Sequence, residues 1–227
     1  MNSEQVILPP MPRRIADLPR DKRGYPVPWF VFWLEGEPHF PIANSQKRVL
    51  AIVDKCCWVC GDNIGAHKAF VVGPMCGVNR TTAEPPCHLE CAEYSVQACP
   101  FLKNPNMKRI EDDLTKEAKS PGGVMITRNP GVSVIWVTKK FGIFKDSSGG
   151  WLINLGEPVG LQFWKEGRRA TKEEVLSSIE AGCHAVEALA EDENDMKGFV
   201  SAKKAFVSMV ENWFLKWDKP ENLETIC

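Results

Sequence analysis

The chain has 227 residues, of which 44% are hydrophobic and 25% are charged, as in an ordinary globular protein. Its formal net charge of −1 excludes a global positive field that would draw the chain to nucleic acid or anionic lipid. No segment approaches the roughly 18 consecutive apolar residues of a membrane span, and no signal peptide is recognisable. We therefore expect a cytoplasmic protein with no membrane partner.

The N-terminal part of the chain starts with a segment rich in proline and arginine, residues 1–28. We expect an extended arm there, because proline lacks the backbone donor that helices and sheets use. Residues 29–34 predict a short buried strand that ends in a turn at 35–38. Residues 45–55 fit a short helix, and residues 69–74 fit a strand.

Most of the nine cysteines fall in one stretch of the chain, from Cys56 to Cys99. In a chain without an export signal, such clustering indicates metal binding in a reducing compartment rather than a disulfide framework. Cys57 and Cys60 have the two-residue spacing of a zinc knuckle, and Gly61 allows the tight turn that such a knuckle needs.

A second ligand pair, His88 and Cys91, follows at the start of a helix predicted for residues 88–99. The helix dipole and the free N–H groups of a helix start favour thiolates. Cys87 is the alternative third ligand, at a less usual spacing from Cys91. The sequence thus predicts a closed, structural zinc site with these ligands: Cys57, Cys60, His88 and Cys91.

A knuckle, a β-hairpin and a ligand-bearing helix, in that order, are typical of a treble-clef zinc finger. Two other interpretations use the same residues. The knuckle has the spacing of a thioredoxin-like redox pair, but no βαβ unit surrounds it. His67, Asn79 and His88 follow the order of an HNH nuclease motif, which needs a histidine base and a metal ligand on the helix. If zinc takes His88, no helix ligand remains for such an enzyme.

The second half of the chain predicts a sheet followed by helices. Four β-rich runs are separated by short breaks, so we expect an antiparallel meander, at residues 132–138, 141–145, 151–155 and 159–164.

Thr171 and Glu174 have the spacing of a helix capping box, and two segments of helical apolar period follow them as a helical hairpin. We expect Trp213 in the core of this hairpin. Trp217, at the end of the second helix, is the candidate for an exposed anchor that docks a partner protein.

Several short motifs of the chain resemble a family of bacterial and phage proteins to which no activity is assigned. The resemblance spans residues 12 to about 183 and rests on these segments: 57–61, 73–76, 78–80, 83–86, His88, 91–94, 98–102, 128–132, 166–168 and 170–171. It implies a zinc-finger-like core in a bacterial or phage cytoplasm, and it leaves the activity open.

We expect an α+β fold, with a treble-clef-like zinc module and a small antiparallel sheet packed by a C-terminal helical hairpin. The expected divisions are an arm (1–28), a zinc-binding module (29–105), a linker (106–122), the sheet with two helices (123–219) and a tail (220–227). The leading hypothesis is a non-catalytic, zinc-stabilised protein that binds nucleic acid. An adaptor that docks a host protein is the alternative, and no small-molecule substrate is evident.

A basic surface beside the zinc module would bind the nucleic acid. Its candidate residues are Arg13, Arg14, Arg80, Lys103, Lys108 and Arg109.

Overall fold

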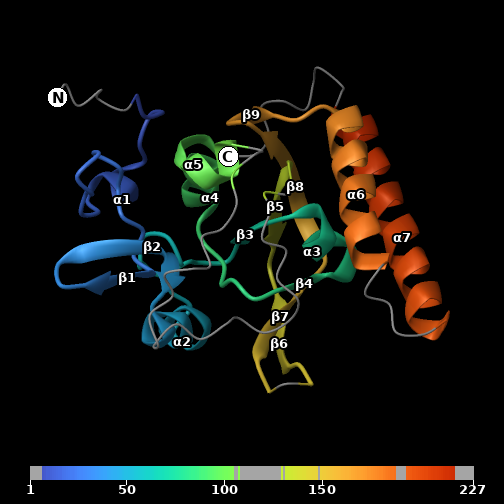
Figure 1. Cartoon of the computed structure of the whole chain (residues 1–227), viewed down its shortest axis with the longest axis horizontal. Helices are drawn as coiled ribbons and strands as arrows, with labels where there is room; N and C mark the ends of the chain where they lie inside the picture. Colours follow the sequence, from blue (N-terminus) through green and yellow to red (C-terminus); the bar gives the residue numbers. More distant parts are fainter. Residues whose placement is uncertain are drawn as a thin grey trace.

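The computed structural model describes residues 7–104, 107, 129, 131–147, 149–187 and 193–217, without the side chains of residues 185, 193, 194 and 217. Helices alternate with short antiparallel sheets along the chain (Figure 1), and this arrangement confirms the predicted mixture of helices and small antiparallel sheets. The predicted linker and tail, 106–122 and 220–227, lie outside the described residues apart from Met107.

A four-stranded antiparallel sheet in the order β3-β5-β8-β9 lies at the centre of the molecule (Figure 1). Its strands are β3 (Lys68–Val72), β5 (Ser133–Thr138), β8 (Pro158–Lys165) and β9 (Arg168–Arg169). All residues of β5 are buried, and this strand is a continuous run of apolar, mostly β-branched or aromatic side chains between Ser133 and Thr138. Such a run requires that both faces of the sheet be covered.

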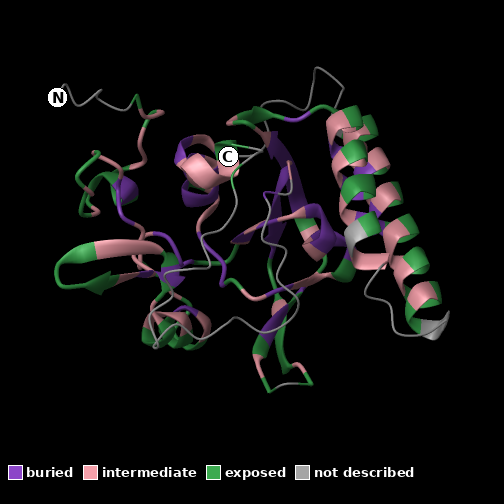
Figure 2. Cartoon of the chain, in the orientation of Figure 1, coloured by how far each residue is buried: buried purple, intermediate pink, exposed green. Residues whose placement is uncertain are grey.

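Alternate residues of β5 therefore point into two different apolar cores. Val134 and Trp136 belong to one core, and Ile135 and Val137 belong to the other. We call these the helical core and the knuckle core. Helix α3 (Pro74–Asn79), together with α6 (Lys172–Glu187) and α7 (Glu193–Trp217), covers the first face. Helices α4 (Leu89–Ala98) and α5 (Pro100–Lys103) cover the second. Figure 2 shows the buried residues concentrated in the sheet and on the sides of the helices that face it.

The helical core is closed by α6 (Lys172–Glu187) and α7 (Glu193–Trp217), which pack against each other and against α3. Phe206 of α7 is 2% exposed. A side chain at Gly77 of α3 would lie 2.5 Å from its ring, so the two helices approach closely because this position has no side chain. Trp213 is half-buried at the margin of this core, and the side chain of Trp217 is not described.

The predicted capping box at the start of α6 is present. The Thr171 amide donates to a Glu174 carboxylate oxygen at 2.9 Å, and the Glu174 amide donates to Thr171 Oγ1 at 3.3 Å. Within the described part of the chain, no helix has both the length and the apolar character needed to cross a membrane.

A second, smaller sheet in the order β4-β7-β6 corrects the predicted meander. Its strands are β4 (Thr81–Thr82), β7 (Trp151–Leu155) and β6 (Phe141–Lys145). The four predicted β runs are all strands, but β5 pairs with β8 and the hairpin β6-β7 leaves the central sheet. At the point of departure, the hydroxyl of Thr138 lies 2.9 Å and 2.8 Å from the carbonyl oxygens of Lys140 and Glu157, either of which can accept its hydrogen bond. It thereby joins the two ends of the hairpin where the chain leaves β5 and returns to β8.

The N-terminal part contains helix α1 (Arg13–Ala16), the hairpin of β1 (Val31–Leu34) and β2 (Glu37–Ala43), and helix α2 (Ser45–Val53). A strand is present within the predicted residues 29–34, but Trp33 and Leu34 are exposed, so the prediction that this strand is buried was wrong. The strand belongs to a two-stranded hairpin, in which Val31 is buried and Phe32 is half-buried.

The turn of this hairpin is shorter than predicted, since Glu35 and Gly36 form it with positive φ angles and Pro38 already lies in β2. Within the segment predicted as an extended arm, Ile15 and Val27 are each 1% exposed, so these two side chains are packed into the protein.

Candidate metal centre

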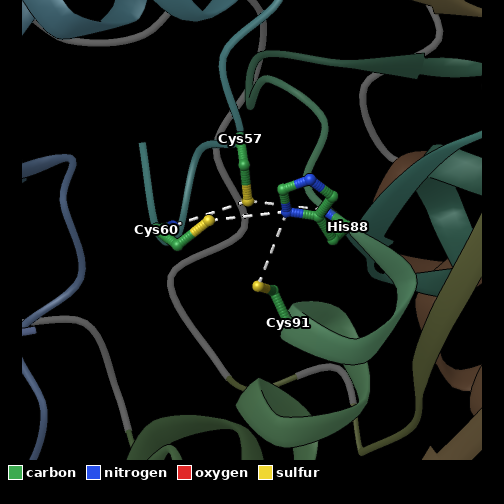
Figure 3. Close-up of side chains that lie close together, drawn as sticks. All are labelled: Cys57, Cys60, His88 and Cys91. Carbon is green, nitrogen blue, oxygen red and sulfur yellow. Dashed lines mark hydrogen bonds between the residues drawn. The ribbon is translucent and has the colours of Figure 1, made fainter. Parts of the chain in front are cut away.

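Four side chains from two distant parts of the sequence converge on one point (Figure 3). Their ligand atoms all lie within 4.8 Å of one another, and the residues are Cys57, Cys60, His88 and Cys91. Cys57 and Cys91 are 0% exposed, while Cys60 and His88 are half-buried. The structure thus brings together the four residues that the sequence predicted as zinc ligands.

The first ligand pair lies on the tight turn between α2 and β3. Gly61 has φ +84°, and its amide donates to the carbonyl of Cys57 at 2.8 Å. A side chain at Gly61 would also lie 2.8 Å from the ring of Trp29. This turn directs the amide of Cys60 toward the Cys57 sulfur at 3.5 Å. Positive φ and close approach both require glycine after the knuckle.

The second pair lies at the N-terminus of α4, where the first N–H groups of a helix have no partner within the helix. The His88 amide donates to the Cys57 sulfur at 3.4 Å. Cys57 therefore receives backbone donors from both halves of the site, as expected for a sulfur that carries negative charge.

The orientation of His88 determines which ring nitrogen can bind a metal. Nε2 lies 2.9 Å from the carbonyl oxygen of Asn63, and a carbonyl can only accept a hydrogen bond, so Nε2 carries the proton. Nδ1 is then the nitrogen that can bind a metal in exchange for its proton, and it faces the sulfurs of Cys60 at 3.4 Å and Cys91 at 3.8 Å. A second partner that fixes the tautomer is usual for a histidine that ligates a metal.

The geometry fits a tetrahedral ion. Zinc binds sulfur at about 2.3 Å and imidazole nitrogen at about 2.0 Å, so tetrahedral ligand atoms lie roughly 3.5–3.8 Å apart. The two sulfur–nitrogen distances of 3.4 Å and 3.8 Å are close to that range. Three cysteines and one histidine are also a usual donor set for structural zinc. The cluster can hold a metal ion, and Cys57, Cys60, His88 and Cys91 are the residues that would bind it.

The side chains of the cluster shift one another's pKa. Hydrogen bonds from the thiols of Cys60 and Cys91 lower the pKa of Cys57. The thiolate character of Cys57, and then of Cys60, raises the pKa of His88 to about 10. The proton that Cys91 shares with Cys57 and Cys60 raises the pKa of Cys91. A divalent cation that binds the cluster would have to displace these protons.

The two halves of the site are tied together outside the cluster. The Trp58 amide donates to the Pro86 carbonyl at 3.0 Å. On the surface, Arg14 of α1 donates to Asp62 at 2.8 Å and to Glu90 at 3.0 Å. Asp62 follows the knuckle and Glu90 lies in the first turn of α4, so Arg14 bridges both ligand-bearing segments. Sequence reasoning missed this bridge and the Asn63 carbonyl, because no local spacing links residues so far apart in the chain.

The alternative third ligand, Cys87, lies outside the cluster. Its thiol donates to the carbonyl of Ala69 at 3.3 Å, and the two residues form an antiparallel bridge. Burial raises the pKa of Cys87 well above its ordinary value, so this residue is a neutral thiol of the knuckle core. Adjacent residues at a helix start point in different directions, which explains why only His88 reaches the site.

The order of elements between the ligand pairs differs from the expected β-hairpin. Strand β3 follows the knuckle, but it pairs along its length with β5, and helix α3 comes next. The only link of β3 to the segment before α4 is the bridge between Ala69 and Cys87, among the residues described. The treble-clef arrangement therefore remains a prediction.

The residues of the nuclease hypothesis are not brought together as a second metal site. His67 is exposed just before β3, and Asn79 is exposed at the end of α3. His88 belongs to the cysteine cluster. In the part of the chain that the structure covers, this cluster is the single group of three or more closely spaced metal-ligating side chains.

The predicted nucleic-acid residues that the structure describes are Arg13, Arg14, Arg80 and Lys103, and two of them are paired with carboxylates. Arg14 binds two carboxylates, and Arg80 binds both oxygens of Glu157, at 2.5 Å and 3.0 Å. Figure 1 shows α1, which carries Arg14, far from the end of α3, which Arg80 follows. Arg13 and Lys103 are exposed. Lys108 and Arg109 lie outside the described residues.

The chain was also compared with protein-family models, curated proteins and solved structures, and none of the three comparisons returns a significant match. The resemblance to bacterial and phage proteins therefore stays a prediction, and the site must be interpreted from its own geometry.

Proposed function

We propose that this chain is a non-catalytic binding protein whose fold is stabilised by one structural zinc ion, in a treble-clef-like site of Cys57, Cys60, His88 and Cys91. The observation that carries the proposal is the convergence of these ligand atoms within 4.8 Å. Four protein ligands fill a tetrahedral zinc ion, so no coordination position remains for water or substrate. Thiolate ligation also suits a reducing compartment such as the cytoplasm.

We infer a protein partner rather than nucleic acid. Arg14 and Arg80, which were expected to contact phosphates, are each neutralised by carboxylates of the same chain. Large apolar side chains are instead exposed at several places, with Trp33 37%, Trp151 50% and Val53 68% accessible. Exposed aromatic and aliphatic side chains are the kind that anchor protein–protein contacts.

Metal analysis of the purified protein tests the zinc site. We expect one zinc per chain in the wild type and none in a Cys57→Ser/Cys60→Ser variant. Cys87→Ser is the matched control, because it alters a buried thiol beside the cluster and should retain the metal. A wild-type stoichiometry near zero, or full metal retention by the double variant, would contradict the proposal.

The partner class can be tested by isolating complexes from a host lysate with and without nuclease treatment, at two salt concentrations. A protein partner should persist after the nuclease and depend weakly on salt. Association with nucleic acid should disappear, and its affinity should fall steeply as salt is raised.

A further inference from the structure

Strand β6 forms an open edge of the smaller sheet. In the sheet order β4-β7-β6, β7 is the one strand paired with β6 among the residues described. Figure 1 shows the β6-β7 hairpin projecting from the body of the molecule, and Figure 2 shows it exposed toward its turn. An open edge of this kind presents unpaired backbone groups that another strand can bind.

The hydrogen bonds around β7 show which groups of β6 face outward. The Asp146 amide donates to the Gly150 carbonyl at 2.9 Å, so this pair is hydrogen-bonded within the hairpin. Antiparallel residue pairs alternate between hydrogen-bonded and non-hydrogen-bonded, so the backbone N–H and C=O groups of Phe144 and Gly142 also point toward β7. The backbone donors and acceptors of Phe141, Ile143 and Lys145 must then point to the open side.

The opposite edge of β7 gives the same result independently. The amide of Leu155 donates to the carbonyl of Arg80 at 2.7 Å, toward β4. Leu155 is the residue that pairs with Phe141 in the hairpin register. Since the Leu155 amide is directed away from β6, the pair Phe141–Leu155 is not hydrogen-bonded. The backbone groups of Phe141, and of every second residue after it, therefore point to the open side of β6.

The side chains along this edge are apolar in the middle. Ile143 is 46% exposed and Phe144 is 39% exposed, and Trp151 on the neighbouring strand is 50% exposed. Free backbone groups beside exposed apolar side chains are the combination that β-strand addition uses, with the backbone giving affinity and the side chains giving specificity.

Basic residues flank the apolar stretch at both ends. Lys139 and Lys140 precede β6, and Lys145 ends it, with its ammonium group 4.8 Å from the centre of the Trp151 ring. Within the described residues, none of these lysines lies within ion-pair distance of a carboxylate. A second copy of β6 would bring six lysines together, and lysines at an edge oppose such self-pairing. The charge instead complements an acidic partner.

We propose that the open edge of β6 binds an extended peptide segment of a partner protein, with an apolar centre flanked by acidic residues, as a fourth strand of the β4-β7-β6 sheet. This inference rests on the binding role proposed above, but it does not depend on the metal. The apolar centre would lie beside Ile143 and Phe144, and the acidic residues would lie near Lys139, Lys140 and Lys145.

A displayed library of random twelve-residue peptides is the probe for this edge. Selection on the wild-type protein should enrich segments with three to five apolar or β-branched residues between acidic residues. Hydrogen exchange then provides the direct readout. On addition of an enriched peptide, the amides of Ile143 and Lys145 should become protected, whereas Gly142 and Phe144, which already face β7, should change little.

Ile143→Pro removes one outward donor and leaves the bonds to β7 in place, as edge strands tolerate. It should weaken binding of the enriched peptides at least tenfold, while Ile143→Thr, which keeps the amide, should weaken binding less. If Ile143→Pro lowers the melting temperature, the variant Lys139→Glu/Lys140→Glu/Lys145→Glu tests the edge without a backbone change. It should reduce binding of acidic peptides at least tenfold.

Enrichment of no peptides, or of peptides whose binding resists both variants, would overturn the proposal. Preferential binding of oligodeoxythymidylate would overturn it in favour of nucleic acid, and a dimer that Ile143→Pro dissociates would assign the edge to a second copy of the chain. Zinc stoichiometry is measured on the same samples. If the protein holds a full complement of zinc but binds no peptide, only the proposal for the β6 edge is contradicted. If it binds peptide but holds no zinc, only the proposal for the zinc site is contradicted.

Discussion

The two faces of the central sheet are stabilised in different ways. On the helical face, Phe206 and Val210 of α7 and Ile179 of α6 pack onto the sheet in a continuous apolar core. On the knuckle face, the core is built around Cys57 and its neighbours, and its outer boundary is the cluster of three cysteines and one histidine that could hold a metal ion. Apolar burial can stabilise the first face without a cofactor, whereas the proposed zinc ion would stabilise the second face through its bonds to three thiolates and an imidazole.

This difference follows from the lengths of the covering elements. Helices α6 and α7 are long and amphipathic, and each places an apolar stripe on α3 or the sheet. The elements on the knuckle face are the short helices α1, α4 and α5 and the knuckle turn, which have few apolar positions each. Short elements bury little surface, and small units of this kind usually need a metal or a disulfide.

Removal of the metal should therefore have the largest effect, and the effect should be confined to one face. With zinc removed by a chelator, we expect amide exchange in residues 56–64 and 87–98 to accelerate by at least about 100-fold. Structural zinc contributes roughly 10–16 kcal/mol of folding free energy in isolated finger peptides. Removing the metal should therefore destabilise the knuckle face more than truncating any single side chain would. Exchange in α6 and α7 should change much less, as measured by mass spectrometry. Equal acceleration on both faces would show that the sheet unfolds as one unit.

The sequence predicted the chemistry of the metal centre better than the arrangement of the strands. Ligand spacing is local, so Cys57-x2-Cys60 and His88-x2-Cys91 could be identified without knowledge of the fold. Strand pairing is not local, and the β5–β8 pair encloses a hairpin that a linear pattern cannot distinguish from a meander. The pairing of β3 with β5 crosses some 60 residues and has no sequence signal of its own.

Truncation of Phe206 should have the largest effect on the helical face. Phe206→Ala removes a ring that stacks with Trp136 at 6.3 Å between centroids, and burial of this kind predicts a loss of about 3–5 kcal/mol in the free energy of unfolding. Chemical denaturation measures the loss, and Phe206→Leu, which keeps most of the volume, is the milder control. Zinc stoichiometry should stay at the wild-type value. If Phe206→Ala releases the metal, the two faces are not independent.

Acidification should weaken the knuckle face selectively. Zinc must displace the protons that the thiols and His88 hold, and the pKa of His88 in the metal-free cluster is raised to about 10 by Cys57 and Cys60. Protons therefore compete with the metal more strongly as the pH falls. Zinc affinity should drop at least about 100-fold from pH 8 to pH 6, since each displaced proton contributes tenfold per pH unit. Competition with a chelator of known affinity measures the drop, and an affinity independent of pH would exclude proton displacement.

The smallest expected effect concerns the start of α6 on the helical face. Thr171 Oγ1 accepts from the Glu174 amide at 3.3 Å, and loss of such a cap costs about 1 kcal/mol, so Thr171→Ala should lower the free energy of unfolding by that amount. Thr171→Ser keeps the hydroxyl and is the matched control. Glu174 also binds Arg168 at 2.6 Å, and this pairing holds the pKa of the carboxylate below its ordinary value.

That ion pair stabilises the folded state above the ordinary pKa of a glutamate and is lost only as the pH falls through the lowered value. The hydrogen bond from the Glu174 amide to the Thr171 hydroxyl, in contrast, involves no group that titrates between pH 6 and pH 8. The loss caused by Thr171→Ala should therefore be the same at pH 8 and pH 6, where zinc affinity differs strongly. Denaturation at both pH values, with zinc in excess, measures it. A loss that varies with pH between these values would mean that the helix start is coupled across the sheet to the metal centre.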